Sequence, residues 1–241
     1  LAVMAACAVV GIIIGVVSLT SFGTVMTSSI VTLGAGSLFL TLILTMLASM
    51  VLGMGLPSIP AYIITATMAA PALAGFDIPI LAAHMFVFYF GIFANITPPV
   101  CLAAFAGAGI SGGDPMKTGF LSLKLALAGF IVPFMFIYNP TMLMIDPTGL
   151  AVTAKEFPLP PIIDIITVVV TSVTGVIALS SALEGYFRGS MNPLMRAVLA
   201  IGALLLIYPE ITTGIAGGVI VLGIALFNIK TSKPPTPTVT V

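Results

Sequence analysis

The chain has 241 residues, of which 60% are hydrophobic and only 6% are charged, with a mean hydropathy of +1.30. Soluble domains carry about one-quarter charged residues, so this composition excludes a water-soluble surface and indicates a membrane protein. The seven basic and seven acidic side chains cancel, which excludes an electrostatic footprint for nucleic acid. One histidine, His84, leaves little for a histidine-based metal site.

The first 76 residues contain no charged side chain and no histidine. A helix needs about 20 residues to cross a bilayer, so this run holds more than one span. We expect spans at 3–19 and 38–53, joined by a Gly/Ser/Thr-rich link at 20–37. The chain begins at Leu1 without a charged leader, and we expect it to be a fragment, holding one of the two structural repeats from which secondary transporters are often built.

Two clusters of proline and glycine interrupt the apolar sequence. The first, 53–60, reads GMGLPSIP and is followed by an apolar stretch at 62–73. At 1.5 Å per residue that stretch is about 18 Å long, too short to span about 30 Å of hydrocarbon, so it predicts a half-helix. The second, 95–99, reads NITPP and separates a helix at 81–93 from another half-helix at 100–109.

The remaining sequence predicts spans at 119–137 and 162–183, a Pro-rich external segment at 139–161, a hairpin of short helices at 194–208 and 211–227, and a disordered tail at 230–241. Under the positive-inside rule, the side that carries most of the basic residues is cytoplasmic. These residues are Lys117, Arg188, Arg196, Lys230 and Lys233.

Backbone that leaves the helix at membrane depth survives only inside protein or beside a water-filled cavity. There helix N-termini favour anions, and freed carbonyls and hydroxyls such as those of Ser58 and Thr97 coordinate hard cations such as Na⁺. An ordinary proline kink is the competing interpretation of either break. Two such breaks about 40 residues apart favour a transporter.

Three stretches carry a resemblance to a known family: LGMGLPSIPAYIITATMAAPAL, AAHMFVFYFGIFANITPPVCLAAFAGAGISGGDPMKTG and IVPFMFIYNP. They resemble the C-terminal half of the large membrane subunit of tripartite ATP-independent periplasmic (TRAP) transporters, in the fused-permease branch that works with TAXI-type solute-binding proteins. The resemblance covers about residues 1–145. It implies that 146–229 is a variable transmembrane extension.

The resemblance implies an all-α polytopic membrane protein with discontinuous helices and a helical hairpin, forming one half of an inverted-repeat, elevator-type importer. Its coupling ion would be Na⁺, without another cofactor. Its partners would be a periplasmic solute-binding protein, a small membrane subunit or fused N-terminal portion, and the lipid of the bacterial inner membrane. The residues matching the site-forming breaks are Gly53, Gly55, Pro57, Ser58 and Pro60 in the first, and Asn95, Thr97, Pro98 and Pro99 in the second.

Two positions depart from the family pattern. Many members have aspartate where this chain has Pro57, and glycine where it has Cys101. The first departure leaves neutral oxygens as the cation ligands, and we expect them to come from Ser58, Asn95 and Thr97. The second departure places a side chain where glycine has none, so we expect less room for another group to approach the backbone at the second break. Cys101 and Cys7 lie in apolar stretches and are expected to be buried hydrophobic residues.

Other residues admit two interpretations. His84 is either a neutral histidine bonded to a neighbouring helix or a proton relay. Tyr62 and Tyr89 either pack against other aromatic residues or line the solute path. Ser111, within Gly109–Gly112, fits the short motif of intramembrane serine proteases with His84 as base, but no histidine follows the serine. We therefore expect a protein that is not an enzyme; a structural membrane anchor, the third class, would need neither break.

Overall fold

The computed structural model describes residues 2–145, 159–187, 189–208 and 211–231. Within these ranges the regular structure is helical, with one isolated bridge between Tyr186 and Ser190, so the predicted all-α class is confirmed. The chain divides into two compact units, Leu1–Ala126 and Leu127–Val241. Each unit is described by itself.

Several described helices are suited to a membrane. Pro115–Tyr138 and Ile162–Glu184 are long and apolar enough to cross it, with 24 and 23 residues. Two bent pairs raise the number of candidate spans among the described residues from two to four if each pair is one span: Gly11–Val17 with Phe22–Gly34, at 70°, and Ser58–Met68 with Ala70–Phe76, at 46°. The predicted polytopic membrane protein is therefore confirmed.

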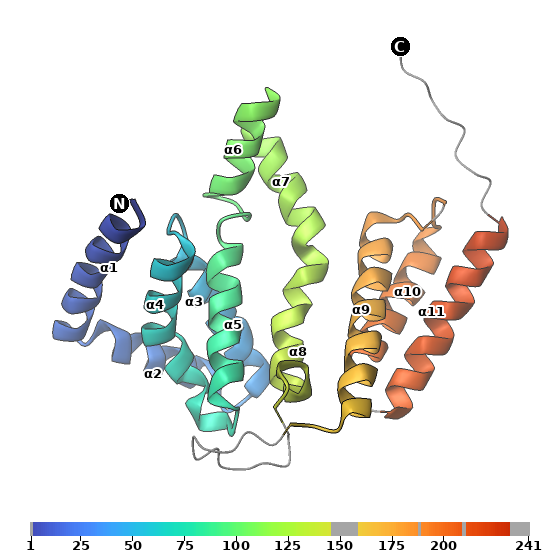
Figure 1. Ribbon diagram of the computed structural model, residues 1–241, viewed down its shortest axis with the longest axis horizontal. Coiled ribbons are helices and arrows are strands. Elements are labelled where there is room, and N and C mark those ends of the chain that lie inside the picture. The colour runs from blue at the N-terminus through green and yellow to red at the C-terminus, as the bar shows by residue number, and fades with distance from the viewer. Residues whose placement is uncertain (1, 146–158, 188, 209–210, 232–241) are drawn as a thin grey trace. The chain divides into compact units, whose positions relative to one another are not determined.

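The first unit contains seven α-helices and one 3₁₀ helix in its described residues (Figure 1). They are α1 (Ala2–Leu19), α2 (Phe22–Gly34), α3 (Leu38–Gly53), α4 (Ser58–Met68), η1 (Ala70–Phe76), α5 (Ile80–Phe93), α6 (Leu102–Ser111) and α7 (Pro115–Ala126).

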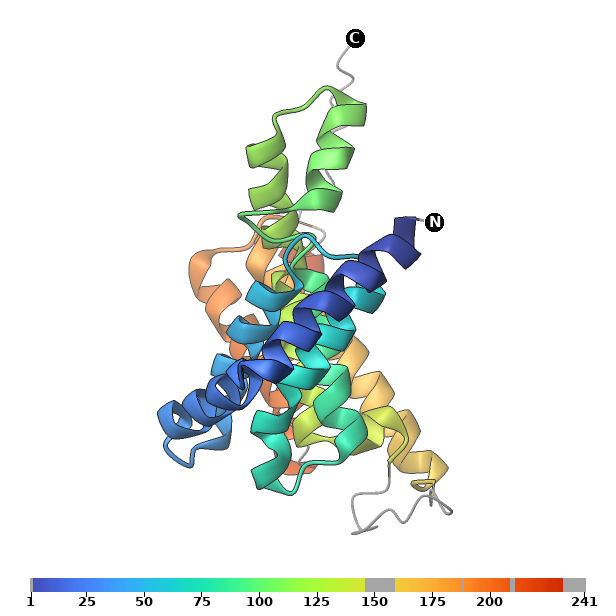
Figure 2. The same ribbon diagram turned by 90° about the vertical axis from the view of Figure 1, so that its left-hand side faces the viewer.

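Helices α3 and α4 form a hairpin whose two limbs both pack on α5. The contact is made by fully buried apolar side chains, among them Leu42 of α3, Met68 of α4, and Phe86 and Phe90 of α5. The two phenylalanine rings meet edge to face, with centroids 5.0 Å apart. Helix α6 continues beyond the end of α5 rather than folding back on it, and forms a second hairpin with α7 (Figure 2).

The link predicted at 20–37 is wrong, because α2 occupies most of it. The prediction treated its serines and threonines as turn residues. Within a helix, a hydroxyl also bonds to a carbonyl of the preceding turn, and Thr24 and Ser28 do so, to the carbonyls of Ser21 and Val25 at 2.7 and 2.9 Å. A polar stretch between two apolar ones is therefore helical here.

Short helices form at both predicted half-helices, but their bounds differ from the prediction. Helix α4 begins at Ser58, so Ser58 and Pro60 belong to the helix rather than to the break. Proline is tolerated there because N–H groups of the first turn have no partner within the helix. The apolar stretch then bends into η1, whereas the second half-helix is Leu102–Ser111 rather than 100–109.

The second unit contains η2 (Leu127–Ile131), α8 (Val132–Tyr138), η3 (Pro140–Leu143), α9 (Ile162–Glu184), α10 (Pro193–Ile207) and α11 (Ile211–Thr231). The predicted span at 162–183 and the hairpin of α10 and α11 are confirmed. Most of the predicted external segment, at 146–158, and the tail from residue 232 lie outside the described residues.

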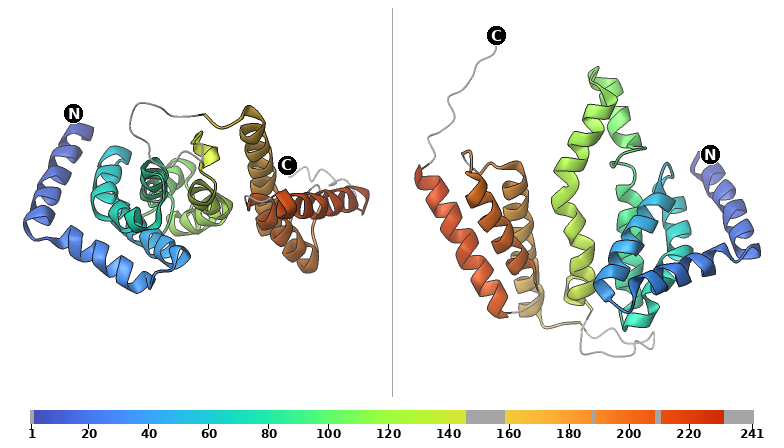
Figure 3. Two further views of the ribbon diagram at one scale, coloured as in Figure 1. Left: turned by 90° about the horizontal axis from the view of Figure 1, so that it is seen from below. Right: turned by 180° about the vertical axis from the view of Figure 1, so that it is seen from behind.

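The last three helices, α9, α10 and α11, form a group that Figure 3 shows from two sides, and small residues let them pack closely. Helix α10 packs against both α9 and α11. A Cβ added at Gly175 of α9 would lie 2.6 Å from Ile207 Cγ1, and one added at Gly202 of α10 would lie 2.6 Å from Ile220 Cγ2. Glycine is thus required for these helices to pack so closely.

Arg196 stabilises the C-terminal end of α9. Its Nε and one terminal nitrogen donate to the carbonyl oxygens of Ala182 and Leu183, both at 2.8 Å. The last carbonyls of a helix have no partner within it and form its negative end. Gly185 follows with φ +76° and leaves room for the guanidinium, because a Cβ there would lie 3.1 Å from Arg196 Cζ.

We expect Arg196→Met to lower the free energy of unfolding by about 1.5–3 kcal/mol, the range for hydrogen bonds to a charged group. Thermal unfolding of the detergent-solubilised full-length protein would measure it. Lys117→Met is the control, since the Lys117 side chain makes no hydrogen bond within the described residues. Equal melting temperatures for the two variants would contradict this role of Arg196.

Candidate functional site

The first break is the tip of the α3–α4 hairpin. Only Met54–Pro57 lie outside the two helices. Gly55 has φ +74°, a conformation that strongly favours glycine, and Pro57 directly precedes the first residue of α4. The tip therefore has one residue that permits the turn and another that starts the returning helix.

Gly53, the last residue of α3, lies against the backbone of α5. A Cβ added to it would clash with the carbonyl oxygen of Gly91 and would lie 2.7 Å from Gly91 Cα. On its other side, Gly91 lies close to Thr65 of α4, whose Cγ2 would be 3.4 Å from an added Cβ. Gly53 thus lets α3 pack closely on α5 next to the tip, whereas an added Cβ at Gly91 would make only ordinary contact with α4.

The second break, Ala94–Cys101, is an unwound stretch that joins α5 to α6. Thr97 is 2% exposed, and its hydroxyl donates to the carbonyl of Phe93 at 3.0 Å. The Pro98–Pro99 peptide bond is cis. Cys101 is buried with φ +42°, a conformation that favours glycine. This conformation gives a physical reason for the glycine that many family members have at this position.

A side chain of the second break bonds to the first. Asn95 Nδ2 donates to the carbonyl oxygen of Leu56 at 3.2 Å. Near the same point, a Cβ added at Gly55 would lie 3.8 Å from Val100 Cγ1. The structure therefore brings the hairpin tip and the unwound stretch together, although about 40 residues separate them in sequence.

The predicted site residues differ in their surroundings. Ser58 is exposed at the start of α4, and its hydroxyl makes no hydrogen bond within the described residues. Pro60 is buried inside α4, whereas Pro57 and Pro99 are exposed and Pro98 is half-buried. No hydrogen bond joins Ser58 to the second break among the described residues.

Backbone oxygens are available at both breaks. Within the described residues, the carbonyls of Met54 and Gly55 at the tip, and of Ile96 and Pro98 in the unwound stretch, accept no hydrogen bond. Asn95 Oδ1 also remains as an acceptor, because its amide bonds through nitrogen. Neither break contains a carboxylate, so the cation ligands that the breaks themselves offer are neutral oxygens.

Two groups that shape the candidate site, Gly91 and the Leu56 carbonyl, are not among the predicted site residues. Gly91 stands alone within the aromatic sequence of α5, and an isolated glycine in a helix signals close packing, so its role was open to prediction. The Leu56 carbonyl carries no such signal, because any residue supplies a backbone oxygen.

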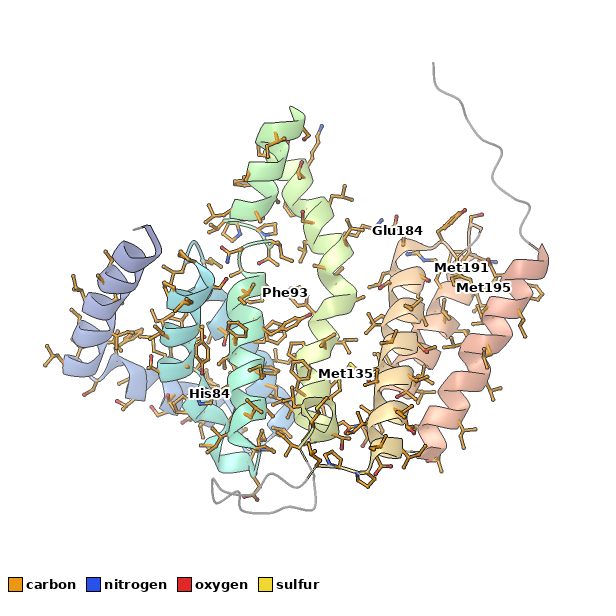
Figure 4. All side chains as sticks on the ribbon, in the orientation of Figure 1. His84, Phe93, Met135, Glu184, Met191 and Met195 are labelled. Atoms are coloured by element: carbon orange, nitrogen blue, oxygen red, sulfur yellow. The ribbon has the colours of Figure 1, made fainter. Side chains whose placement is uncertain are left out.

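His84 bonds to a neighbouring helix. Its Nδ1 lies 3.0 Å from the Tyr62 hydroxyl of α4, and the Tyr62 ring meets that of Phe88 edge to face at 5.4 Å. Tyr89 stacks on Phe93, with ring centroids 4.5 Å apart. These contacts match the packing interpretations of His84, Tyr62 and Tyr89. Figure 4 shows His84 and Phe93 toward opposite ends of α5.

Ser111 and His84 do not form a catalytic pair. The serine is the last residue of α6, which continues beyond the Phe93 end of α5, while His84 lies toward the other end of α5. The Ser111 hydroxyl bonds to the carbonyl of Ala108 at 3.3 Å, and His84 bonds to Tyr62. A serine nucleophile requires a base within hydrogen-bond reach, and within the described part of the chain the Ser111 hydroxyl bonds to no base.

Apolar spanning helices, a hairpin tip and an unwound helix that meets it define a polytopic membrane protein of the transporter class. The family model of the tripartite ATP-independent periplasmic transporter, DctM component, matches residues 1–148. The chain therefore belongs to this family, which is a transporter component and not an enzyme. No curated protein and no solved structure matches the chain.

Proposed function

We propose that this chain contributes ion and solute ligands to a secondary active, Na⁺-coupled importer. The observation that carries the proposal is the hydrogen bond from Asn95 to the Leu56 carbonyl, which holds the tip next to the unwound stretch. The proposed ligands are the free carbonyls of both breaks, Asn95 Oδ1, and the hydroxyls of Thr97 and of Ser58, the first residue of α4. Backbone freed from helices at membrane depth supplies ligands for Na⁺ in secondary transporters.

Two helices begin at this region, which suits an anionic part of the solute. Helix α4 begins at Ser58, at the tip, and α6 begins at Leu102, directly after the unwound stretch. The first N–H groups of a helix have no partner within it and form its positive end. Oxygens would hold the cation. The solute would be held by N–H groups of these first turns other than that of Ala103, which donates to the carbonyl of Asn95.

The proposed ligands predict a specific change in ion dependence. We expect Thr97→Val and Ser58→Ala each to raise the Na⁺ concentration for half-maximal uptake about tenfold or more, which corresponds to about 1.4 kcal/mol. The measurement is uptake by the full-length transporter in proteoliposomes at graded Na⁺. Valine keeps the shape of Thr97, so a change in ion dependence would reflect the lost oxygen.

Thr65→Val is the matched control for Thr97→Val. Thr65 is also fully buried, and its hydroxyl also donates to the carbonyl four residues earlier, that of Ala61, at 2.9 Å. It lies in α4, outside both breaks. An unchanged Na⁺ dependence in both site variants, or the same shift in Thr65→Val, would overturn the assignment of these ligands.

We also propose the partners and the location. A periplasmic solute-binding protein, of the TAXI type, would deliver solute to a permease completed by a small membrane subunit or a fused N-terminal portion. The bacterial inner membrane would hold it, and an elevator motion would carry the breaks across. Support comes from the family match over residues 1–148 and from the sequence resemblance.

Charge placement predicts the orientation of the chain. Under the positive-inside rule, Lys117, Arg196 and Lys230 lie on the cytoplasmic side and residues 139–161 outside. In a full-length protein lacking Cys7 and Cys101, a membrane-impermeant maleimide applied to cells with a permeable outer membrane should label a cysteine at Thr148 and spare one at Ser232. The opposite labelling pattern would mean an inverted orientation.

A further inference from the structure

A pocket of about 490 Å³ lies in the first unit, between α1, α2, α4 and η1. Residues of both α1 and α2 line it, and these helices meet at 70°, a bend visible in Figure 3, left. Neither break contributes to it. Its lining residues are Ile14, Val17, Ser21, Gly23, Thr24, Thr27, Ser28, Val31, Thr67 and Pro71.

The pocket offers almost no hydrogen-bond donor to an occupant. Four of its five hydroxyl side chains donate to backbone carbonyls: Thr24 to Ser21, Thr27 to Met68, Ser28 to Val25, and Thr67 to Ile63, at distances of 2.7–3.1 Å. The fifth, Ser21, is exposed at the bend. None of the lining residues is charged. A solute that needs hydrogen-bond donors, such as an anion, would lose its hydration without replacement, so the walls favour a hydrocarbon over an anionic solute.

The shape and surroundings favour a flexible hydrocarbon over another helix. A straight helix packs along one axis at 8–10 Å, and it cannot follow two walls that diverge by 70°. Aliphatic side chains of α1 and α2 outside the pocket are exposed, among them Val16 at 54% and Val25 at 58%. Lipid tails are as apolar as these side chains, so contact with lipid suits them.

We propose that this pocket binds one acyl chain of a membrane phospholipid. The chain would lie between the bent pair α1–α2 and the α4 limb of the hairpin, against Val17 and Val31. Gly23 leaves room for it, since a Cβ there would make only ordinary contacts, 3.5 Å to Val17 Cγ1 and 3.9 Å to Met68 Cγ. The proposal is independent of Na⁺ coupling.

Photocrosslinking would test the proposal on the full-length transporter. Phosphatidylcholine vesicles would contain a minor fraction of a phosphatidylcholine with a diazirine in mid acyl chain, and labelled peptides would be mapped by mass spectrometry. We expect labelling of peptides covering 14–31 and 67–71. Gly23→Leu, which fills the pocket, should reduce that labelling at least fivefold. Ser28→Leu should do the same, and because Ser28 is exposed, we expect this variant to fold.

Gly15→Leu is the matched control, because Gly15 lies on the same bent pair with nothing within 4 Å of an added Cβ and does not line the pocket. Labelling of α9 at its exposed residues Val169 and Val170 would report bulk lipid and should be equal in all proteins. The proposal is overturned if peptides 14–31 and 67–71 are unlabelled, or if both pocket variants are labelled as strongly as Gly15→Leu. It is also overturned if a diazirine on the headgroup labels these peptides as strongly as one in the acyl chain.

Discussion

Gly53→Ala is expected to abolish solute uptake by the full-length transporter. The added Cβ would overlap the carbonyl oxygen of Gly91 and lie 2.7 Å from its Cα. These are backbone atoms of α5, so no side-chain rotation relieves the contact. Helices α3 and α5 must separate next to the tip, which would displace Leu56 from Asn95. Overpacking alone costs about 1–3 kcal/mol, and the lost alignment of the two breaks adds to it.

The sign of this effect separates packing from helix propensity. Alanine within a helix is more favourable than glycine by about 0.5–1 kcal/mol, so propensity alone predicts a stabilised α3. Gly107→Ala in α6, where an added Cβ meets nothing within 4 Å, is the control and should keep its uptake. Thermal unfolding and uptake of both variants would be compared. A Gly53→Ala protein that is stable and active would show that the approach of α3 to α5 is not required.

The positions of the breaks were predictable because proline and glycine act locally. Proline removes a backbone donor and glycine permits left-handed dihedrals, so the clusters at 53–60 and 95–99 indicated interrupted helices without knowledge of the fold. Their forms were not predictable. The first is a hairpin tip and the second an unwound stretch because α4 folds back against α3, while α6 continues beyond α5, and neither packing choice is encoded within the break itself.

The errors have local causes as well. Helix α2 replaces the predicted Gly/Ser/Thr-rich link because serine and threonine hydroxyls bond within the helix, as in Thr24 and Ser28. Within the site, the Asn95 side chain can be recognised from its residue type, but the Leu56 carbonyl that it bonds to cannot, because every residue has a backbone carbonyl. Residue identity therefore predicts which groups are available, and only the fold determines which of them meet.

The contact between Asn95 and Leu56 gives the second large expected effect. Asn95→Leu keeps a side chain of similar size but removes the donor, leaving the half-buried Leu56 carbonyl unpaired. An unpaired buried acceptor costs about 1–3 kcal/mol, and here the cost falls on the alignment of the tip with the unwound stretch. We expect uptake to fall about tenfold or more, with a raised Na⁺ requirement because Asn95 Oδ1 is also lost.

Asn95→Asp separates these two losses. An ionised aspartate keeps an oxygen for the cation but donates no hydrogen bond, and its charge repels the Leu56 carbonyl. If alignment matters most, both variants lose uptake; if Asn95 serves only as a cation ligand, the aspartate variant transports at least as well as the parent at low Na⁺. Asn139→Leu is the matched control, since Asn139 is half-buried and its side chain makes no hydrogen bond within the described residues. Uptake at graded Na⁺ that is the same for Asn95→Leu and Asn139→Leu would mean that the bond between the breaks does not hold the site together.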